Sequence, residues 1–243
     1  MQTLAATEEK KVCFTEGQYL VKTLEDESEW RQAYYLRHKV FAEQLKWVPE
    51  RSDRLESDVY DAWSSTVGVF SDEANILGLV RMTHAPVPFM LESEFSACLV
   101  GSHQVRKELD TAEITRLAVD PDIKERGPST DIMQAAIKGA YQWCLAHDVR
   151  YTYIVVEERL FRGLRLMGWP CEAIGEPVSL PPAGAVSIAA LIDLDEFRCL
   201  NGRKRPALLK WFSTAETLVS LPTPAASRPT RRTSSPAIQL AKA

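Results

Sequence analysis

Residues 111–168 constrain the fold most, because two strand patterns alternate there with two helix patterns. The first strand pattern, TAEITRLAV at 111–119, is β-branched and alternating, which predicts a central strand. The second, YTYIVV at 151–156, is a continuous apolar run, which predicts a strand buried on both faces. A helix pattern follows each strand. This order predicts an α/β sheet flanked by helices.

The helix between the two strands has an apolar stripe at three- and four-residue spacing, which predicts that one of its faces packs on the core. The stripe consists of Met133, Ala136, Ile137, Ala140, Trp143 and Cys144. Ser129 or Thr130 is expected to cap its N-terminus. Gly168 is expected to end the second helix in a left-handed C-terminal cap.

The first half of the chain adds further elements to this unit. GQYLVKT at 17–23 predicts a short strand, and residues 27–45 predict a helix that Asp26 or Ser28 caps. The polar stretch after Pro49 predicts a long loop that ends at Asp61.

Later segments complete the organisation. Residues 65–83 predict an antiparallel hairpin, and AVSIAALIDL at 185–194 predicts another strand. The order resembles a single-domain acyltransferase of the GNAT kind, with a mixed central sheet. We expect a flexible leader at 1–16, one domain at 17–220, and a disordered tail at 221–243 that is rich in Pro, Ser, Thr and Ala.

Composition excludes several classes of function. A net charge of -4 over 243 residues argues against a whole-surface nucleic-acid binder. The five cysteines are widely spaced and form no CxxC pair, so reduced thiols in the cytoplasm are expected. No run approaches the roughly 20 apolar residues that a bilayer span needs. The four histidines lack ligand spacing and no Gly-x-Ser-x-Gly elbow occurs, so neither a metal site nor a serine hydrolase is predicted.

Six charged residues occur in segments that otherwise suggest burial. Three of the six are positive and three are negative, so they could form a neutral buried network if the fold brings them together. They are Arg37, Asp58, Asp61, Arg81, Glu113 and Arg116. The alternative is a set of scattered surface ion pairs.

Four stretches in order resemble the acyl-homoserine-lactone synthases, the LuxI type of autoinducer synthase. They are RHKVFAEQLKW, LESDVYD, GLVRMTHAPVPFML and AEITRL. The resemblance covers an Arg with a Phe four and a Trp ten residues later, a Glu-x-Asp-x-x-Asp stretch, a strand Arg, and Glu-x-(Ser/Thr)-Arg. The matching positions are Arg37, Phe41, Trp47, Asp58, Asp61, Arg81, Glu113, Thr115 and Arg116.

The resemblance implies transfer of a fatty acyl group from an acyl carrier protein or acyl-CoA to the amine of S-adenosylmethionine. Lactone closure then releases methylthioadenosine. S-adenosylmethionine is a substrate in this scheme, so no cofactor is expected. Phe41, Trp47 and Thr115 are expected to line its pocket, and Tyr60 and Trp63 are further candidates.

Glu113 is expected to take the proton of the substrate amine, directly or through water. Its alternative role is that of a structural partner of an arginine. In a regular strand Glu113 and Thr115 share one face and Arg116 the other, so either a bulge re-aims Arg116 or it serves the opposite layer.

Two further regions are assigned to the acyl donor. Met133, Ile137, Ala140 and Val155 are expected to line an acyl pocket, with ordinary core as the alternative. A basic run is expected to dock an acidic carrier protein, with a solvated helix face as the alternative. The run consists of Arg150, Arg159, Arg162 and Arg165. The turn at 124–129 is similar to the phosphate-cradling loop of GNAT enzymes, although an ordinary capped turn has the same residues.

Two other functions stay open from the sequence. An N-acyl amino acid synthase or exosortase-associated acyltransferase would use another amine and need no adenosyl pocket. A regulator that binds an acyl group or a nucleoside would have the fold without turnover. Trp47, Asp58 and Asp61 favour the lactone synthase over the first of these. The presence of all eight matching charged or aromatic positions disfavours the second.

Overall fold

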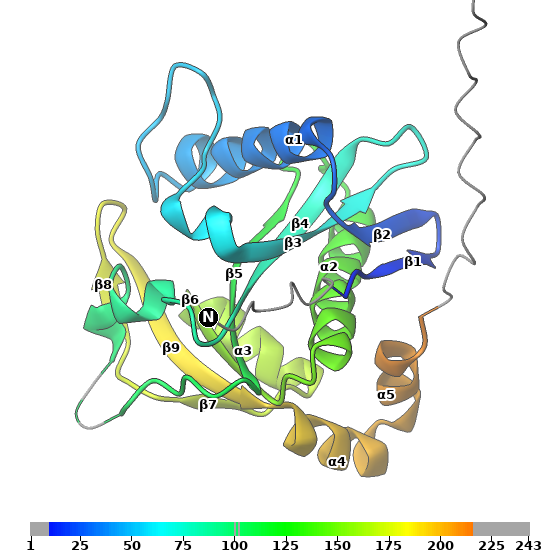
Figure 1. The fold of residues 1–243 in the computed structure, drawn as a ribbon, viewed down its shortest axis with the longest axis vertical. Coiled ribbons are helices and arrows are strands. Elements are labelled where there is room, and N and C mark those ends of the chain that lie inside the picture. Colours follow the sequence, from blue (N-terminus) through cyan, green and yellow to red (C-terminus); the bar gives the residue numbers. More distant parts are fainter. Residues whose placement is uncertain (1–9, 100, 102, 216–243) are drawn as a thin grey trace, which may run out of the picture.

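The computed structural model describes residues 10–99, 101 and 103–215 (Figure 1). Within them one sheet has the strand order β1-β2-β3-β4-β5-β6-β9-β7, with β8 paired to β9. All neighbours are antiparallel except β5 and β6, so the sheet is mixed, as predicted. The strands are β1 (Cys13–Glu16), β2 (Tyr19–Thr23), β3 (Ser64–Phe70), β4 (Ile76–His84), β5 (Thr111–Val119), β6 (Tyr151–Glu157), β7 (Cys171–Ala173), β8 (Val178–Leu180) and β9 (Ala185–Asp193).

Helices pack on both faces of this sheet, as Figure 1 shows for α1 and α2. The α-helices are α1 (Glu27–Arg37), α2 (Arg126–Ala146), α3 (Glu158–Met167), α4 (Leu194–Lys204) and α5 (Pro206–Ser213). A π-helix, η1 (His38–Gln44), continues α1, and three short 3₁₀ helices are η2 (Val59–Trp63), η3 (Met90–Glu92) and η4 (Ser96–Cys98). Leu79 packs with the α1 cluster, whereas its neighbour Val80 packs with the α2 cluster. Strand alternation therefore separates two cores, one on each face.

The parallel strands β5 and β6 separate along their length. They pair only over residues 111–114 and 151–154, although β5 continues to Val119 and β6 to Glu157. The unpaired ends leave a gap in the middle of the sheet. Whatever binds there can reach both faces of the sheet.

A bulge in β5 lies beside this gap. Leu79 pairs with Ala118 and Arg81 with Thr115, so Arg116 and Leu117 both stand opposite Val80. Arg116 has a φ of 54°, in the left-handed region that costs an L-residue roughly 1 kcal/mol or more. Of the two predicted alternatives for Arg116, the bulge is confirmed.

Several predicted boundaries are wrong. The leader was expected to extend to residue 16, but β1 covers the end of it and pairs with β2. α2 begins at Arg126, so Ser129 and Thr130 lie inside the helix and do not cap it. Pro128 fits this early start, because a residue in the first turn needs no backbone N–H bond. The short strands β7 and β8 precede the predicted strand of β9, and the helices α4 and α5 follow it.

Other predictions are confirmed. Asp26 caps α1 by accepting from the Glu29 N–H at 2.9 Å, and Gly168 ends α3 with a φ of 100°. The predicted hairpin is β3 and β4. The predicted tail at 221–243 lies outside the described residues. No helix in the described part of the chain is long and apolar enough to cross a bilayer.

Candidate active site

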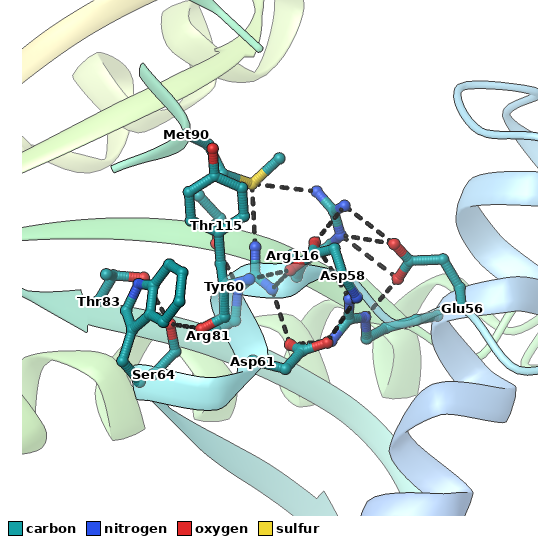
Figure 2. Close-up of polar contacts among 12 residues, drawn as sticks. Glu56, Asp58, Tyr60, Asp61, Ser64, Arg81, Thr83, Met90, Thr115 and Arg116 are labelled. Atoms are coloured by element: carbon teal, nitrogen blue, oxygen red, sulfur yellow. Dashed lines mark hydrogen bonds and ion pairs between the residues drawn. The ribbon is translucent and has the colours of Figure 1, made fainter. Parts of the chain in front are cut away.

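Three arginines and three carboxylates converge between α1 and the sheet (Figure 2). Arg37 comes from the end of α1, Arg81 from β4 and Arg116 from the β5 bulge. The carboxylates of Glu56 and Asp58 come from the segment just before η2, and that of Asp61 comes from η2 itself.

The spacing of the two aspartates has a local cause. Asp58 Oδ1 accepts from the Tyr60 N–H at 3.0 Å, and Asp61 Oδ2 accepts from the Asp58 N–H at 2.8 Å. Each aspartate thus uses backbone donors to begin η2 and still presents oxygen to an arginine. The short helix fixes where the two carboxylates point.

Arg37 binds all three carboxylates. Its Nε donates to Glu56, its Nη1 to Asp61 Oδ1 at 2.6 Å, and its Nη2 to Asp58 Oδ2 at 3.4 Å. The side chain is only 1% exposed. Arg37 therefore joins α1 to the segment that carries the carboxylates.

Arg81 and Arg116 join the same carboxylates to the sheet. Arg81 Nη1 lies 2.6 Å from Asp58 Oδ1 and 2.7 Å from Asp61 Oδ1. Arg116 Nη2 lies 2.9 Å from Glu56 Oε1 and 2.8 Å from Asp58 Oδ2. Arg81 Nε also donates to Thr115 Oγ1 at 3.0 Å. We call these six charged residues the arginine–carboxylate network.

The network agrees with the predicted neutral cluster except for one member. Glu56 takes the place expected for Glu113, so the three negative charges are Glu56, Asp58 and Asp61. Burial opposes ionisation of Glu56, but Arg116 and Arg37 outweigh it and lower its pKa to about 2. The signal was present in the sequence, because Glu56 is the first residue of the Glu-x-Asp-x-x-Asp stretch.

Glu113 is fully buried and forms no ion pair with the three arginines of the network. Its two carboxylate oxygens accept from the Met90 and Leu91 N–H groups, each at 2.7 Å. Burial raises its pKa to about 7, against the lowering effect of those two bonds and of Arg81. Glu113 is thus the partner of a backbone turn, not of an arginine. Its role as proton acceptor stays a prediction.

A cavity of about 500 Å³ opens beside the network. We call it the loop-side cavity, because the segments after α1 and around η2, η3 and β8 surround it. Its wall includes Phe41, Trp47, Asp58, Tyr60, Met90, Glu94 and Arg116. Asp58 and Arg116 are the network members that reach this wall, whereas the other four hold them in place.

The predicted aromatic residues of this site lie as follows. Phe41 and Trp47 are stacked with ring centroids 5.9 Å apart, and the Arg116 guanidinium lies 5.4 Å from the Phe41 ring. Tyr60 lines the loop-side cavity, and its hydroxyl bonds Ser93 and Glu94. Trp63 packs edge-on against Tyr60 without lining the cavity.

A second cavity, of about 170 Å³, lies between the sheet and helices α2 and α3. We call it the helix-side cavity. Ile137, Ala140 and Val155 line it together, and their role in an acyl pocket stays a prediction. Thr115, expected beside Phe41 and Trp47, lies in this wall and not in that of the loop-side cavity. Met133 lines neither cavity, because it sits one helical turn before Ile137, beyond the end of the hollow.

The two cavities meet where β5 and β6 separate. Their shared wall, which we call the junction, consists of Phe41, Trp47, Arg116, Val155, Val156 and Glu157. A ligand in one cavity can therefore touch a ligand in the other. Sequence reasoning did not single out Glu157.

The predicted basic run is split by the structure. Arg159, Arg162 and Arg165 are exposed on α3. Arg150 lies 2.8 Å from Asp193 and 3.1 Å from Asp195, so its charge is compensated locally. Arg162 pairs with Glu158 at 2.5 Å. Among the described residues, no group of three His, Cys, Asp or Glu side chains is arranged to hold a metal.

Comparison with known proteins places this geometry in context. The model of the autoinducer synthase family matches residues 21–200. A probable acyl-homoserine-lactone synthase of Sinorhizobium fredii is 29% identical over 192 residues, which cover 76% of this chain and 89% of the relative.

Solved structures with the same fold include two acyl-homoserine-lactone synthases. LasI aligns with a TM-score of 0.66 at 21% identity, over 76% of this chain and 95% of LasI. The CoA-dependent synthase BjaI, solved with SAM and isopentyl-CoA, aligns with a TM-score of 0.59 at 19% identity, over 73% of this chain and 82% of BjaI. These two likenesses establish the fold.

Proposed function

This chain belongs to the autoinducer synthase family, and from that premise we propose how its two cavities divide the substrates of an acyl-homoserine-lactone synthase. S-adenosylmethionine occupies the loop-side cavity, and the acyl chain of a thioester occupies the helix-side cavity. The amine and the thioester carbon meet at the junction. The observation that supports this assignment is the wall that the two cavities share. The loop-side cavity has charged groups in its wall, whereas the helix-side cavity is mostly apolar.

The charges of the loop-side cavity suit this substrate. S-adenosylmethionine has a sulfonium, an ammonium and a carboxylate, so it presents both signs of charge. Arg116 offers a guanidinium to the carboxylate, while Asp58 and Glu94 offer carboxylates to the cationic groups. The Phe41 and Trp47 rings offer faces that attract a sulfonium.

The buried residues hold this wall rigid. Arg37 and Arg81 form ion pairs with Asp58, and Glu56 forms one with Arg116. Asp61 in turn pairs with both Arg37 and Arg81. Glu113 fixes the turn at Met90, whose side chain lines the cavity and contacts Arg81 at 2.9 Å through its sulfur. A preorganised wall lowers the cost of orienting the amine.

Two bond exchanges complete the reaction. In the first, the neutral amine nitrogen forms a bond to the thioester carbon and the carbon–sulfur bond breaks. The thiolate takes one of the two amine protons, and the other stays on the amide nitrogen. In the second, the substrate carboxylate attacks the carbon bound to the sulfonium. That carbon–sulfur bond breaks with its electron pair on sulfur, and neutral methylthioadenosine leaves.

The carrier of the acyl group is the second part of the proposal. An acyl carrier protein is acidic, and Arg159, Arg162 and Arg165 give α3 an exposed basic face on a chain of net charge -4. α3 also supplies Leu160 and Leu164 to the helix-side cavity. A carrier docked there would lie close to the apolar pocket. Acyl-CoA is the alternative donor.

Mass spectrometry tests the proposal directly. Purified protein is incubated with S-adenosylmethionine and an acyl thioester, on a carrier protein in one series and on CoA in another. We expect acyl-homoserine lactone and methylthioadenosine in equal amounts. Acylation of another amine without methylthioadenosine would favour an N-acyl amino acid synthase. Binding of both substrates without product would favour a silent regulator.

A further inference from the structure

One carboxylate at the junction is unused by the network. Of the six residues that line both cavities, Glu157 alone is acidic. Within the described part of the chain its carboxylate has no hydrogen-bond or ion-pair partner. It is half-buried, at the place where β6 ends and α3 begins.

The direction of the Glu157 side chain follows from strand alternation. Glu157 is directly opposite Ser187 of β9, and Ser187 lines the loop-side cavity. Directly paired residues project to the same face of a sheet, and so do residues two apart, such as Val155 and Glu157. The side chain does not cap α3, although it stands at the N-cap position. It is therefore free to meet a ligand.

The other carboxylates near the cavities already accept bonds from protein donors, which suits them to attract a cationic group rather than to take its proton. Asp58 binds three arginines, and Glu94 accepts from Ser93 and Tyr60. Glu113 accepts two backbone N–H groups and lines neither cavity. A proton acceptor has to lie within hydrogen-bond reach of the amine, which the proposed function places at the junction.

We propose that Glu157 is the general base of acyl transfer in this protein. The substrate ammonium gives one proton to the Glu157 carboxylate, and the neutral amine then attacks the thioester carbon. The second proton passes from the adduct nitrogen to the departing thiolate. Glu157 releases its proton to water when the product leaves. This assignment rests on the proposed function, because that function brings an amine to the junction.

Glu157→Gln keeps the size of the side chain and removes its basicity. We expect kcat to fall by about 100-fold or more, the range for loss of a general base, with little change in KM for S-adenosylmethionine. The rate should then rise with pH, because the amine must lose its proton to water. Glu172→Gln on β7 is the matched control, since that exposed carboxylate lines neither cavity, and it should keep the wild-type rate.

Chemical rescue separates a base from a structural group. Glu157→Ala opens space at the junction, and added acetate should restore part of the rate in proportion to its concentration. The same assay on Glu113→Gln should leave the wild-type pH profile, because Glu113 lines neither cavity. A change in profile equal to that of Glu157→Gln would assign the base to Glu113 instead.

Three results would overturn the assignment. They are a Glu157→Gln enzyme as fast as wild type, a rise in KM alone, or a loss of rate with an unchanged pH profile and no acetate rescue. If wild-type protein forms no acyl-homoserine lactone, the proposed function fails instead. The thermal unfolding midpoint of each variant verifies that it is folded.

Discussion

The two cavities that meet at the junction are built in different ways. The wall of the loop-side cavity depends on charged side chains from α1, β4, β5 and the segment before η2, each fixed by ion pairs. The helix-side cavity depends on the separation of β5 and β6 and on apolar side chains of α2 and α3. Removal of one charged residue should abolish activity, because its buried partners lose their compensation. A change in the volume of an apolar residue should shift the acyl-chain selectivity only gradually. The following predictions test that difference.

The largest effect is expected in the arginine–carboxylate network. Arg37→Ala or Asp61→Ala leaves buried partners without compensation, so each should lower the free energy of unfolding by about 3 kcal/mol and abolish activity. Urea unfolding and the lactone assay measure the two effects. Arg159→Ala, on the exposed face of α3, is the control and should change stability by less than about 0.5 kcal/mol. Unchanged unfolding midpoints in both network variants would contradict the ion-pair account.

The contributions of two buried carboxylates to the free energy of unfolding should change with pH in opposite directions. The pKa of Glu56 is lowered to about 2, so its stabilisation is present above pH 4.5 and is lost as the pH falls toward 2. The pKa of Glu113 is raised to about 7, so the folded state holds its proton and loses about 3 kcal/mol of stability as the pH rises from 4.5 to 7.

Glu113→Gln tests this contrast. It should remove the decline between pH 4.5 and 7. The amide oxygen can accept from one of the Met90 and Leu91 N–H groups, but the other then faces the amide NH2, which cannot accept. We also expect turnover to fall by roughly 100-fold, whether through a proton transfer or through the displaced turn. Equal slopes of stability against pH in both proteins would show that Glu113 is already ionised at pH 4.5.

Volume should control the helix-side cavity. Ala140→Leu and Val155→Phe each enlarge a wall residue, so the enzyme should favour shorter acyl chains by roughly fivefold, since a lost contact or overlap costs on the order of 1 kcal/mol. The ratio of short to long lactones made by a stably folded variant is the measurement. Met133→Phe is a matched control, because Met133 lines neither cavity. An unchanged ratio in both wall variants would mean that the acyl chain lies elsewhere.

The smallest effect is expected at the basic face of α3. Arg159→Glu combined with Arg165→Glu should weaken use of an acyl carrier protein several-fold, more at low salt than at high salt, and leave S-adenosylmethionine binding unchanged. Arg150→Glu should matter less, because Asp193 and Asp195 already compensate that charge. If the rate with acyl carrier protein changes with neither mutation nor salt, the donor is acyl-CoA or the carrier docks on another face.

The order of elements could be predicted from the sequence because it depends on local periodicity. The strands of β5, β6 and β9 and the helices α2 and α3 have apolar patterns long enough to identify them. The strand β1 could not be identified, because four residues, CFTE, have too short a pattern and form a strand only by pairing with β2.

The site could be predicted only in part, because it depends on which distant residues meet. The charge pattern indicated five of the six network members, but Glu56 and Glu113 exchange roles through contacts across 60 and 23 positions of the chain. Glu157 had no sequence signal, since a Glu at the start of a helix reads as an ordinary first-turn residue. Its position at the junction follows from the separation of β5 and β6.

A crystal structure with S-adenosylmethionine and an unreactive acyl thioether analogue tests the central claim most directly. The account predicts the adenosyl ligand beside Trp47 and Asp58, the acyl tail between Ile137 and Leu164, and the substrate amine next to the sulfur-bound carbon of the analogue at the junction. An acyl tail in the loop-side cavity, or an amine out of reach of that carbon, would contradict it.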